Sequence, residues 1–171
     1  MSDKKSISKE VFVVAGAPGS GKSSLVRDSL QPGDIVVDMD AIAAALLGTV
    51  SNHPDYSTIM PLILAVRDAL HQTIAARLGE WQRAFVITGT PDDNQLDQLV
   101  KQLNGKCIYL DADEATCLER VESDPNRPDK DKARAVVHDW FYKHEHMKRR
   151  FAGAYIYPHS RGLAVSYTHL R

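Results

Sequence analysis

The stretch that decides the fold is Gly16-Ala17-Pro18-Gly19-Ser20-Gly21-Lys22-Ser23, a complete G-x-x-x-x-G-K-S sequence. It follows the apolar, strand-like residues 10–15 and precedes residues 23–30, whose composition suits a helix. A strand, a glycine-rich turn and a helix in this order are the setting of a phosphate-binding P-loop. The alternative, a chance octamer in a glycine turn, does not account for the agreement of all three parts. The stretch therefore predicts a nucleotide-binding loop.

The chemistry of this loop assigns roles to individual residues. Its glycines let the backbone come close to phosphate oxygens, so that successive N–H groups and the positive end of the following helix surround the anion. Lys22 is expected to reach the β- and γ-phosphates, and Ser23 is expected to hold Mg²⁺. Ser24 completes the predicted nucleotide-binding set. The expected cofactors are therefore ATP and Mg²⁺.

The composition is that of an ordinary globular chain. Over 171 residues, 43% of the side chains are hydrophobic and 25% are charged, which suits one domain with a buried core. The net charge of −1 disfavours strong binding of duplex nucleic acid and favours a small molecule or a nucleic-acid end as the acceptor. The cysteines, Cys107 and Cys117, indicate neither a disulfide framework nor a zinc site. With no export or membrane segment recognisable, we expect a cytoplasmic protein without a membrane partner.

Apolar runs alternate with helical periods along the chain, which is the pattern of βαβ units around a parallel sheet. We predict strands at residues 10–15, 35–37, 84–87 and 106–110. We predict helices at residues 23–30, 41–47, 58–78, 94–103, 114–122 and 130–151. In the third of these helices the expected buried stripe is Ile59, Leu62, Val66, Leu70 and Ile74. The predicted fold class is α/β, a three-layer P-loop NTPase sandwich around a mainly parallel sheet.

A single domain over residues 10–151 accounts for this pattern, with a flexible N-terminus at residues 1–9 and a lid around residues 120–134. Residues 152–171 are expected to form a C-terminal tail. The last eight of them, AVSYTHLR, resemble the translation of a sequencing-library adapter, so one interpretation places the native C-terminus near Gly162 or Leu163. The other interpretation is a genuine, β-prone tail.

Two aspartates, Asp38 and Asp40, follow the predicted strand at residues 35–37. Ligands of an open parallel sheet bind at the carboxyl ends of its strands. Phosphoryl transfer to a hydroxyl needs a carboxylate that orients the nucleophile and accepts its proton, and commonly a second acid near Mg²⁺. We expect Asp40 or Asp38 to be the base and Asp38 to lie near the metal. The structural alternative for Asp40 is to cap the helix that starts at Ala41.

Arginines on either side of a polar, proline-containing loop at residues 123–129 are candidates for a lid. Arg120 and Arg127 are expected to close over ATP and to neutralise charge on the transferring phosphoryl group, and Arg134 lies near them. Each of them would otherwise be a solvated surface residue. Arg67, in the long helix, could meet an acceptor phosphate, although a solvated helix face explains it more simply.

The third predicted strand ends in Thr88-Gly89-Thr90, where a motor-type ATPase has an Asp-Glu pair. Thr88 and Thr90 could bind substrate or metal-bound water, and turn geometry explains them about as well. Asp111 follows the fourth strand and fits a Walker B pattern, but its simpler role is in the loop and cap before the next helix. The missing Asp-Glu pair favours a kinase over a motor.

On these motifs the chain resembles the small P-loop kinases that include the kinase domain of phage polynucleotide kinase, and the short "AAA family ATPase" proteins of phages. The resemblance covers residues 11–150 and rests on GAPGSGKS, on residues 32–42 and on residues 109–111 followed by 117–121. It implies five parallel strands in the nucleotide-kinase order, Mg-ATP, an acceptor-side aspartate at Asp40 or Asp38, and lid arginines near Arg120 and Arg127. The polynucleotide kinase pattern has an aspartate where this chain has Gly89, which disfavours a 5′-hydroxyl polynucleotide acceptor.

Two functions are compatible with these residues. The first is an ATP-dependent phosphotransferase, a P-loop kinase that moves the γ-phosphate of Mg-ATP to a nucleoside, nucleotide, modified base or nucleic-acid end. The second is a phage-type ATPase or NTP-binding switch that serves a protein or DNA partner. A kinase needs an acceptor pocket and suppresses water, whereas a switch positions water and usually carries a Walker B carboxylate pair. The residues after the third strand favour the first.

Overall fold

The structure, a computed structural model, describes residues 9–146 and the backbone of residues 155–158. Predictions made for residues 1–8, for the last turn of the helix at 130–151 and for residues 159–171 lie outside these residues. No helix within the described ranges combines the length and the apolar character needed to cross a membrane.

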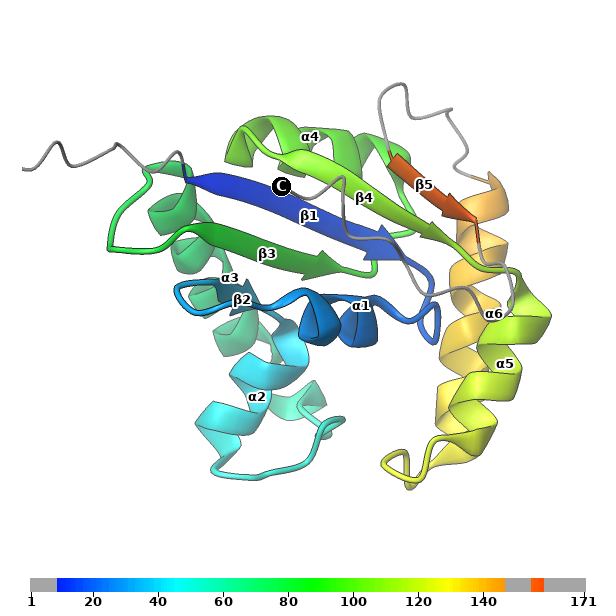
Figure 1. The fold of residues 1–171 in the computed structure, drawn as a ribbon. Coiled ribbons are helices and arrows are strands. Elements are labelled where there is room, and N and C mark those ends of the chain that lie inside the picture. The colour runs from blue at the N-terminus through cyan, green and yellow to red at the C-terminus, as the bar shows by residue number, and fades with distance from the viewer. Residues whose placement is uncertain (1–8, 147–154, 159–171) are drawn as a thin grey trace, which may run out of the picture.

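The centre of the fold is a parallel sheet with the strand order β2-β3-β1-β4-β5 (Figure 1). Strand β1 (Glu10–Gly16) pairs with β3 (Arg83–Thr88) on one side and with β4 (Lys106–Asp111) on the other. Strand β2 (Ile35–Val37) pairs with β3, and the short strand β5 (Tyr155–Pro158) pairs with β4. Because every pair is parallel, the carboxyl ends of the strands meet at one edge, where ligands of such sheets bind.

Helices cover both faces of this sheet, which confirms the predicted α/β class (Figure 1). They are α1 (Lys22–Ser29), α2 (Met39–Leu47), α3 (Met60–Ala75), α4 (Asp93–Leu103), α5 (Glu114–Ser123) and α6 (Lys130–His146), with a 3₁₀ helix η1 (Ser57–Ile59) before α3. Helices α3 and α4 pack on one face and α1 on the other. Helices α5 and α6 pack on each other beside the P-loop and the end of β4.

Alternation along β1 builds the two faces of the core. Val11, Val13 and Ala15 are buried against residues of α3 and α4, whereas Phe12 and Val14 are buried on the face that α1 covers. Each of these valine and phenylalanine side chains contributes roughly 1.5–3 kcal/mol when fully buried. The central strand is therefore held on both sides, which fixes the start of the P-loop at its carboxyl end.

The second helix begins two residues earlier than predicted, and its cap is a different residue. Asp38 has an extended backbone (φ −136°, ψ 131°), and its carboxylate accepts a hydrogen bond from the Asp40 backbone N–H at 3.1 Å. Asp38 is thus the N-cap and Asp40 lies in the first turn, so the alternative role of Asp40 as a cap is wrong. The Asp40 carboxylate is left for other partners.

The long helix also differs from its prediction. It starts after the 3₁₀ turn Ser57–Ile59 and buries Ile63, His71 and Ile74, whereas Leu62, part of the predicted stripe, is 51% exposed. Apolar residues in this segment are spaced so that more than one face of the helix could be buried. Packing against the sheet buries a face that periodicity alone did not identify. Only Ile74 of the predicted stripe is buried.

Strand β5 lies in the segment that the sequence sets apart as a tail. Its backbone pairs in parallel with residues 108–111 of β4. Residues 155–158 therefore extend the sheet, while the division at residue 151 and the origin of the residues after 158 stay predictions.

Candidate active site

The P-loop joins β1 to α1 and depends on glycine at its turns. Gly19 and Gly21 have φ angles of 79° and 100°, in the left-handed region that residues with a side chain rarely adopt. A Cβ atom on Gly19 would lie 2.8 Å from the Cys117 carbonyl oxygen, and one on Gly16 would lie 2.7 Å from the Leu110 carbonyl oxygen. The loop is therefore packed tightly between β4 and α5 and has little freedom to change its shape.

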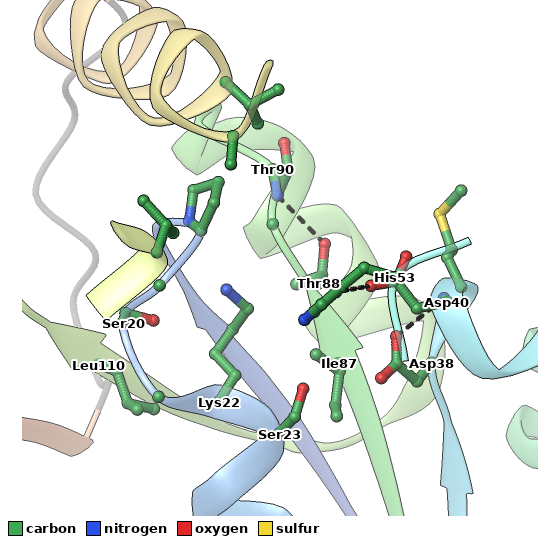
Figure 2. A pocket seen from close by; sticks show the side chains of 18 of the residues that line it. Ser20, Lys22, Ser23, Asp38, Asp40, His53, Ile87, Thr88, Thr90 and Leu110 are labelled. Atoms are coloured by element: carbon green, nitrogen blue, oxygen red, sulfur yellow. Dashed lines mark hydrogen bonds and ion pairs between the residues drawn. The ribbon is translucent and has the colours of Figure 1, made fainter. Parts of the chain in front are cut away.

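Lys22 extends over the concave side of this loop (Figure 2). Its Nζ donates hydrogen bonds to the Gly16 carbonyl oxygen at 2.8 Å and to the Ala17 carbonyl oxygen at 2.7 Å. Burial lowers the pKa of Lys22 to about 8, although the charges on Cys117 and Asp38 act in the opposite direction. The ammonium group lies where an anion bound by the loop would meet it, because the loop N–H groups and Nζ share this hollow.

Ser20 adds a second sign of a ligand site within the loop. Its side chain is 1% exposed, and among residues 9–146 its Oγ is the buried side-chain polar atom without a hydrogen-bond partner. An unpaired buried hydroxyl costs about 1–3 kcal/mol. Such a group calls for an explanation, and a bound phosphate supplies one. The glycine turns, the ammonium group and this hydroxyl together fit a nucleoside triphosphate.

Arg120 lies against the turn of the P-loop. Its Nη1 donates to the Ser20 carbonyl oxygen at 2.9 Å and to the Gly19 carbonyl oxygen at 3.2 Å. The guanidinium therefore joins α5 to the turn of the loop. The sequence assigns this arginine to a lid over ATP, which stays a prediction; in the structure its guanidinium lies beside the phosphate-binding turn.

The two predicted aspartates face the P-loop across the site, with Asp38 and Asp40 on one side and Lys22 and Ser23 on the other (Figure 2). Burial and then the neighbouring Asp40 charge raise the pKa of Asp38, against the hydrogen bond that its carboxylate accepts from the Asp40 N–H. A proton-accepting carboxylate is favoured by a raised pKa. Both aspartates are thus brought together with the P-loop, as the sequence predicts.

The donor set suits Mg²⁺ that shares its coordination with phosphates. Among residues 9–146 no group of three or more histidine, cysteine, aspartate or glutamate side chains could hold a metal ion. Magnesium in phosphoryl-transfer sites is bound by one or two protein oxygens, with phosphate oxygens and water completing the octahedron. Ser23 and Asp38 line the cleft and supply oxygens of this kind, so they are the residues that would hold it.

A third group at the site was not predicted. His53 lies with its Nδ1 at 2.9 Å from Asp40 Oδ2 and its Nε2 at 3.3 Å from Asp124 Oδ2. Arg127 Nε lies 3.4 Å from the same Asp124 oxygen. Tyr56 forms a side-chain hydrogen bond with Asp40, and its pKa is raised, mainly by burial. Neither His53 nor Asp124 belongs to a motif, so no signal in the sequence marks them.

The loop after β3 is held by its own hydrogen bonds and by α6. Thr88 Oγ1 accepts a hydrogen bond from the Thr90 N–H at 3.3 Å, which is turn geometry. Trp140 Nε1 donates to the Gly89 carbonyl oxygen at 2.7 Å and so fixes the loop from α6. The cap of α5 is Asp113, which accepts from the Thr116 N–H at 2.7 Å, and the predicted cap role of Asp111 is wrong. Asp111 instead ends β4 and lines the cleft.

The P-loop, Asp38, Asp40, His53 and Asp124 line one cleft of about 1650 Å³. Typical pockets for one small ligand measure about 300–1,000 Å³, so this cleft has room for a nucleotide and an acceptor. Arg127 lines it, and so does Arg67, whose guanidinium is paired with Asp68 at 2.7 Å. Arg134 is paired with Glu122 and Asp131 on the exposed side of α5 and α6.

Comparison with known proteins gives a family. A sequence model of the AAA_33 family, described as an AAA domain, matches residues 11–152. The chain belongs to this family. A shorter match, 37% identical over 83 residues, is to glutamate–tRNA ligase 2 of Sulfurovum sp. (strain NBC37-1), and it covers 44% of this chain and 18% of that protein.

Solved structures show the fold of this AAA domain. A chain of the Pnkp1/Rnl/Hen1 RNA repair complex superposes with a TM-score of 0.61 at 13% identity, covering 84% of this chain and 46% of that chain. Shikimate kinase from Acinetobacter baumannii in complex with shikimate gives a TM-score of 0.54 at 16% identity, covering 92% and 87%. A gluconokinase from Sinorhizobium meliloti 1021 gives 0.54 at 17% identity, covering 90% and 84%. The resemblance to small P-loop kinases is thereby confirmed at the level of the fold.

Proposed function

We propose that this AAA domain is an ATP-dependent phosphotransferase that moves the γ-phosphate of Mg-ATP to an acceptor bound in the same cleft. The observation that carries the proposal is the pairing of two walls. Lys22 and Ser23 of the P-loop form one wall, and Asp38 and Asp40 form the other. A phosphate donor on the first wall would present its terminal phosphate to an acceptor on the second.

The donor side follows from the P-loop. Loop N–H groups and Lys22 bind the β- and γ-phosphates, and Lys22 exchanges its present bonds to the Gly16 and Ala17 carbonyl oxygens for bonds to phosphate. Ser23 and Asp38 would hold Mg²⁺, which neutralises charge on the phosphate oxygens when it is bound. Arg127, the second of the two arginines assigned to the lid, also lines the cleft.

On the acceptor side, Asp40 takes the proton from the attacking hydroxyl and holds that hydroxyl in line with the γ-phosphate. His53 and Tyr56 orient the Asp40 carboxylate. Asp38 is the other candidate for the base, since its raised pKa favours proton acceptance. The acceptor classes that the sequence suggests are a nucleoside, nucleotide, modified base or nucleic-acid end.

The second candidate is an ATPase or NTP-binding switch for a protein or DNA partner. Asp111, at the end of β4 and next to the P-loop strand, is the carboxylate that such an enzyme would use to position water. The end of β3 offers Thr88, Gly89 and Thr90 in place of an Asp-Glu pair. This difference supports the kinase, because an Asp-Glu pair would position water for hydrolysis, whereas a kinase must keep water away from the γ-phosphate.

A transfer assay separates the two functions. The full chain is incubated with γ-labelled ATP, Mg²⁺ and a panel of nucleosides, nucleotides, DNA and RNA ends and base-modified DNA, and label is followed into each acceptor and into free phosphate. Lys22→Ala serves as the inactive control. Label in one acceptor class supports the proposal. Label that reaches only free phosphate, at a rate unaffected by every acceptor, would contradict it and favour the switch.

A further inference from the structure

His53 joins two segments that are far apart in the sequence. It stands in the loop between α2 and η1, and its ring lies beside Asp40 at the acceptor side of the cleft (Figure 2). Its other nitrogen contacts Asp124, the residue at which α5 ends and the loop 124–129 begins. The contacts thus form a chain from Asp40 through His53 and Asp124 to Arg127.

The chemistry of these contacts makes them directional. An ionised carboxylate only accepts hydrogen bonds, and a ring nitrogen donates only when it carries a hydrogen. A neutral imidazole has one N–H and can donate to only one of the two carboxylates. Both contacts are hydrogen bonds when both ring nitrogens carry a hydrogen. The side chains of His53, Asp40 and Asp124 are 26%, 32% and 27% exposed, which shields this pair of contacts more than an ordinary surface ion pair.

The Asp124 end of the chain is firmly anchored. Its Oδ1 accepts from the Asn126 N–H at 2.9 Å, and its carbonyl oxygen accepts from the Arg127 N–H at 3.2 Å and from Lys130 Nζ. Burial acts to raise the pKa of Asp124, but the Asn126 hydrogen bond and the charges on His53 and Arg127 outweigh it and lower the pKa. The loop that carries Arg127 is therefore attached to His53 through a charged, well-oriented group.

A second ion pair joins the loop of His53 to α6, the helix that follows the loop 124–129, and provides a comparison. Lys132 Nζ lies 3.3 Å from Asp55 Oδ2, and these side chains are 57% and 68% exposed. Exposed pairs of this kind contribute about 0–1 kcal/mol. The pair does not touch Asp40, so a variant that removes it reports on the general cost of losing one cross-segment contact.

We propose that His53 is a positioning residue that orients the Asp40 carboxylate through Nδ1 and holds the loop 124–129, with Arg127, against the acceptor side of the cleft through Nε2. One side chain thereby positions both the Asp40 carboxylate and the loop that carries Arg127. The inference rests on the phosphotransferase function proposed above. Its consequence is that loss of His53 misplaces Asp40 and also admits water to the terminal phosphate.

The first experiment measures partition between transfer and hydrolysis. His53→Ala, His53→Gln, Asp124→Asn and the matched control Asp55→Asn are compared with wild type, using γ-labelled ATP and the best acceptor of the panel. We expect His53→Ala to lower kcat for transfer by about 10²-fold, because a base displaced by about 1 Å loses this much. The ratio of free phosphate to transferred phosphate should rise, and ATP affinity should change by less than about threefold, since the P-loop supplies most phosphate contacts.

The other variants separate the two contacts of His53. Asp124→Asn should raise the ratio of hydrolysis to transfer with a smaller loss of kcat, because Nδ1 still holds Asp40. His53→Gln should restore part of the kcat for transfer, because an amide can donate to one carboxylate. Asp55→Asn should match wild type in kcat for transfer and in the ratio of hydrolysis to transfer. Equal behaviour of His53→Ala and Asp55→Asn, or a joint loss of melting temperature, ATP binding and transfer in His53→Ala, would overturn the proposal.

The second experiment does not depend on an acceptor. Amide hydrogen exchange is measured with ATP and Mg²⁺ for wild type, His53→Ala and Asp55→Asn. We expect faster exchange in residues 49–57 and 124–129 of His53→Ala and little change in the control. Unchanged exchange in both segments sinks the proposed attachment even if the enzyme transfers phosphate. Absence of transfer in wild type, together with the expected exchange pattern, would instead refute the proposed function and keep the attachment.

Discussion

Lys22 is predicted to be needed for nucleotide binding but not for folding. Its side chain contributes no packing to the three buried clusters of the core, and its bonds are to carbonyl oxygens of its own loop. We therefore expect Lys22→Ala to leave a folded protein and to remove nearly all ATP turnover, because the charge at the β- and γ-phosphates is lost. Circular dichroism and phosphate release check the two halves of this prediction. Turnover equal to wild type would contradict the P-loop assignment.

The same residue gives a pH dependence without nucleotide. Burial lowers the Lys22 pKa from 10.5 to about 8 in the folded chain, so between these values the unfolded chain binds more protons than the folded chain. The free energy of unfolding then rises with pH through this contribution. The free-energy cost of burying the charged ammonium group is fully present below pH 8 and disappears above pH 10.5. Urea titrations of wild type and Lys22→Ala at several pH values should show their difference moving in favour of wild type as pH rises. A constant difference would argue against the lowered pKa.

Asp40→Asn tests the acceptor side. Because Asp38 caps α2, the change at Asp40 leaves the cap in place, and the free energy of unfolding should move by less than about 1 kcal/mol. An amide cannot accept the proton of an acceptor hydroxyl, so transfer should fall by roughly 10²–10⁴-fold with ATP affinity nearly unchanged. Asp38→Asn is the matched variant. If Asp40→Asn transfers normally and Asp38→Asn loses transfer with no change in Mg²⁺ dependence, then Asp38 is the base. A joint loss of transfer and hydrolysis with altered Mg²⁺ dependence would assign Asp40 to the metal.

At the residue scale the sequence predicts what short motifs encode. The P-loop residues, Asp38 and Asp40 meet in the cleft because the P-loop follows β1 and the two aspartates lie at the start of α2, just after β2 of the same parallel sheet. His53 and Asp124 could not be predicted, since their meeting depends on how two loops, each without a motif, cross the same cleft. The sequence considers only Asp40 as the cap, and the actual cap, Asp38, is identified by the extended φ and ψ of its backbone.

At the scale of elements, α5 and the P-loop act as one unit. Gly19 packs against the Cys117 carbonyl, and Arg120 donates to the Gly19 and Ser20 carbonyl oxygens. Hydrogen bonds from a charged donor contribute about 1.5–3 kcal/mol, so Arg120→Ala should lower the melting temperature by about 3–12 °C and weaken ATP binding. Differential scanning calorimetry and nucleotide titration measure these effects.

The control for this prediction is Arg134→Ala. Arg134 pairs with Glu122 between α5 and α6, and its side chain is 40% exposed, so its loss should change stability by less than about 1 kcal/mol. If Arg120→Ala matches Arg134→Ala in both measurements, the contact with the P-loop carbonyls has no energetic role, and a lid role for Arg120 would have to be tested with substrate.

Elements with a single strong periodicity were predicted well, and ambiguous ones were not. Helix α4 carries its buried residues, Leu96 and Leu103, on one side of a polar sequence, and its observed start lies one residue before the predicted one. Helix α3 is apolar on several sides, and its buried face includes a histidine, His71, whose pKa burial lowers. A prediction from hydrophobic periodicity counts only apolar positions, so it does not find polar residues that tertiary packing buries.

At the scale of the whole molecule, the central strand β1 pairs with strands that are not its neighbours in sequence. The order β2-β3-β1-β4-β5 places β1 between β3 and β4, and this inserts the P-loop between the ends of two later strands. Local patterns predict the strands but contain nothing about this order, which came from the resemblance to small P-loop kinases. The cleft is a property of the order, since its lining comes from the ends of β1, β2, β3 and β4 and from the loops beyond them.

The C-terminal strand makes a whole-molecule prediction that separates the two interpretations of the tail. Two truncated chains are compared with the full chain: one ends at Leu163 and keeps β5, and the other ends at Gly153 and lacks it. Termini that are not tied into a core add little stability, so the first cut should change the melting temperature by less than about 5 °C.

The second cut should cost more, because it removes the backbone pairing of residues 108–111 with β5. Loss of a few backbone hydrogen bonds at about 0.5–1.5 kcal/mol each lowers the melting temperature of a domain of this size by more than about 5 °C. It also exposes the edge of β4, which promotes association of chains, so light scattering should rise with protein concentration. A large fall after the first cut would show that residues beyond 163 belong to the domain. No fall after either cut would place the end of the stable domain near residue 151, because a strand that stabilises nothing is not part of the folding unit.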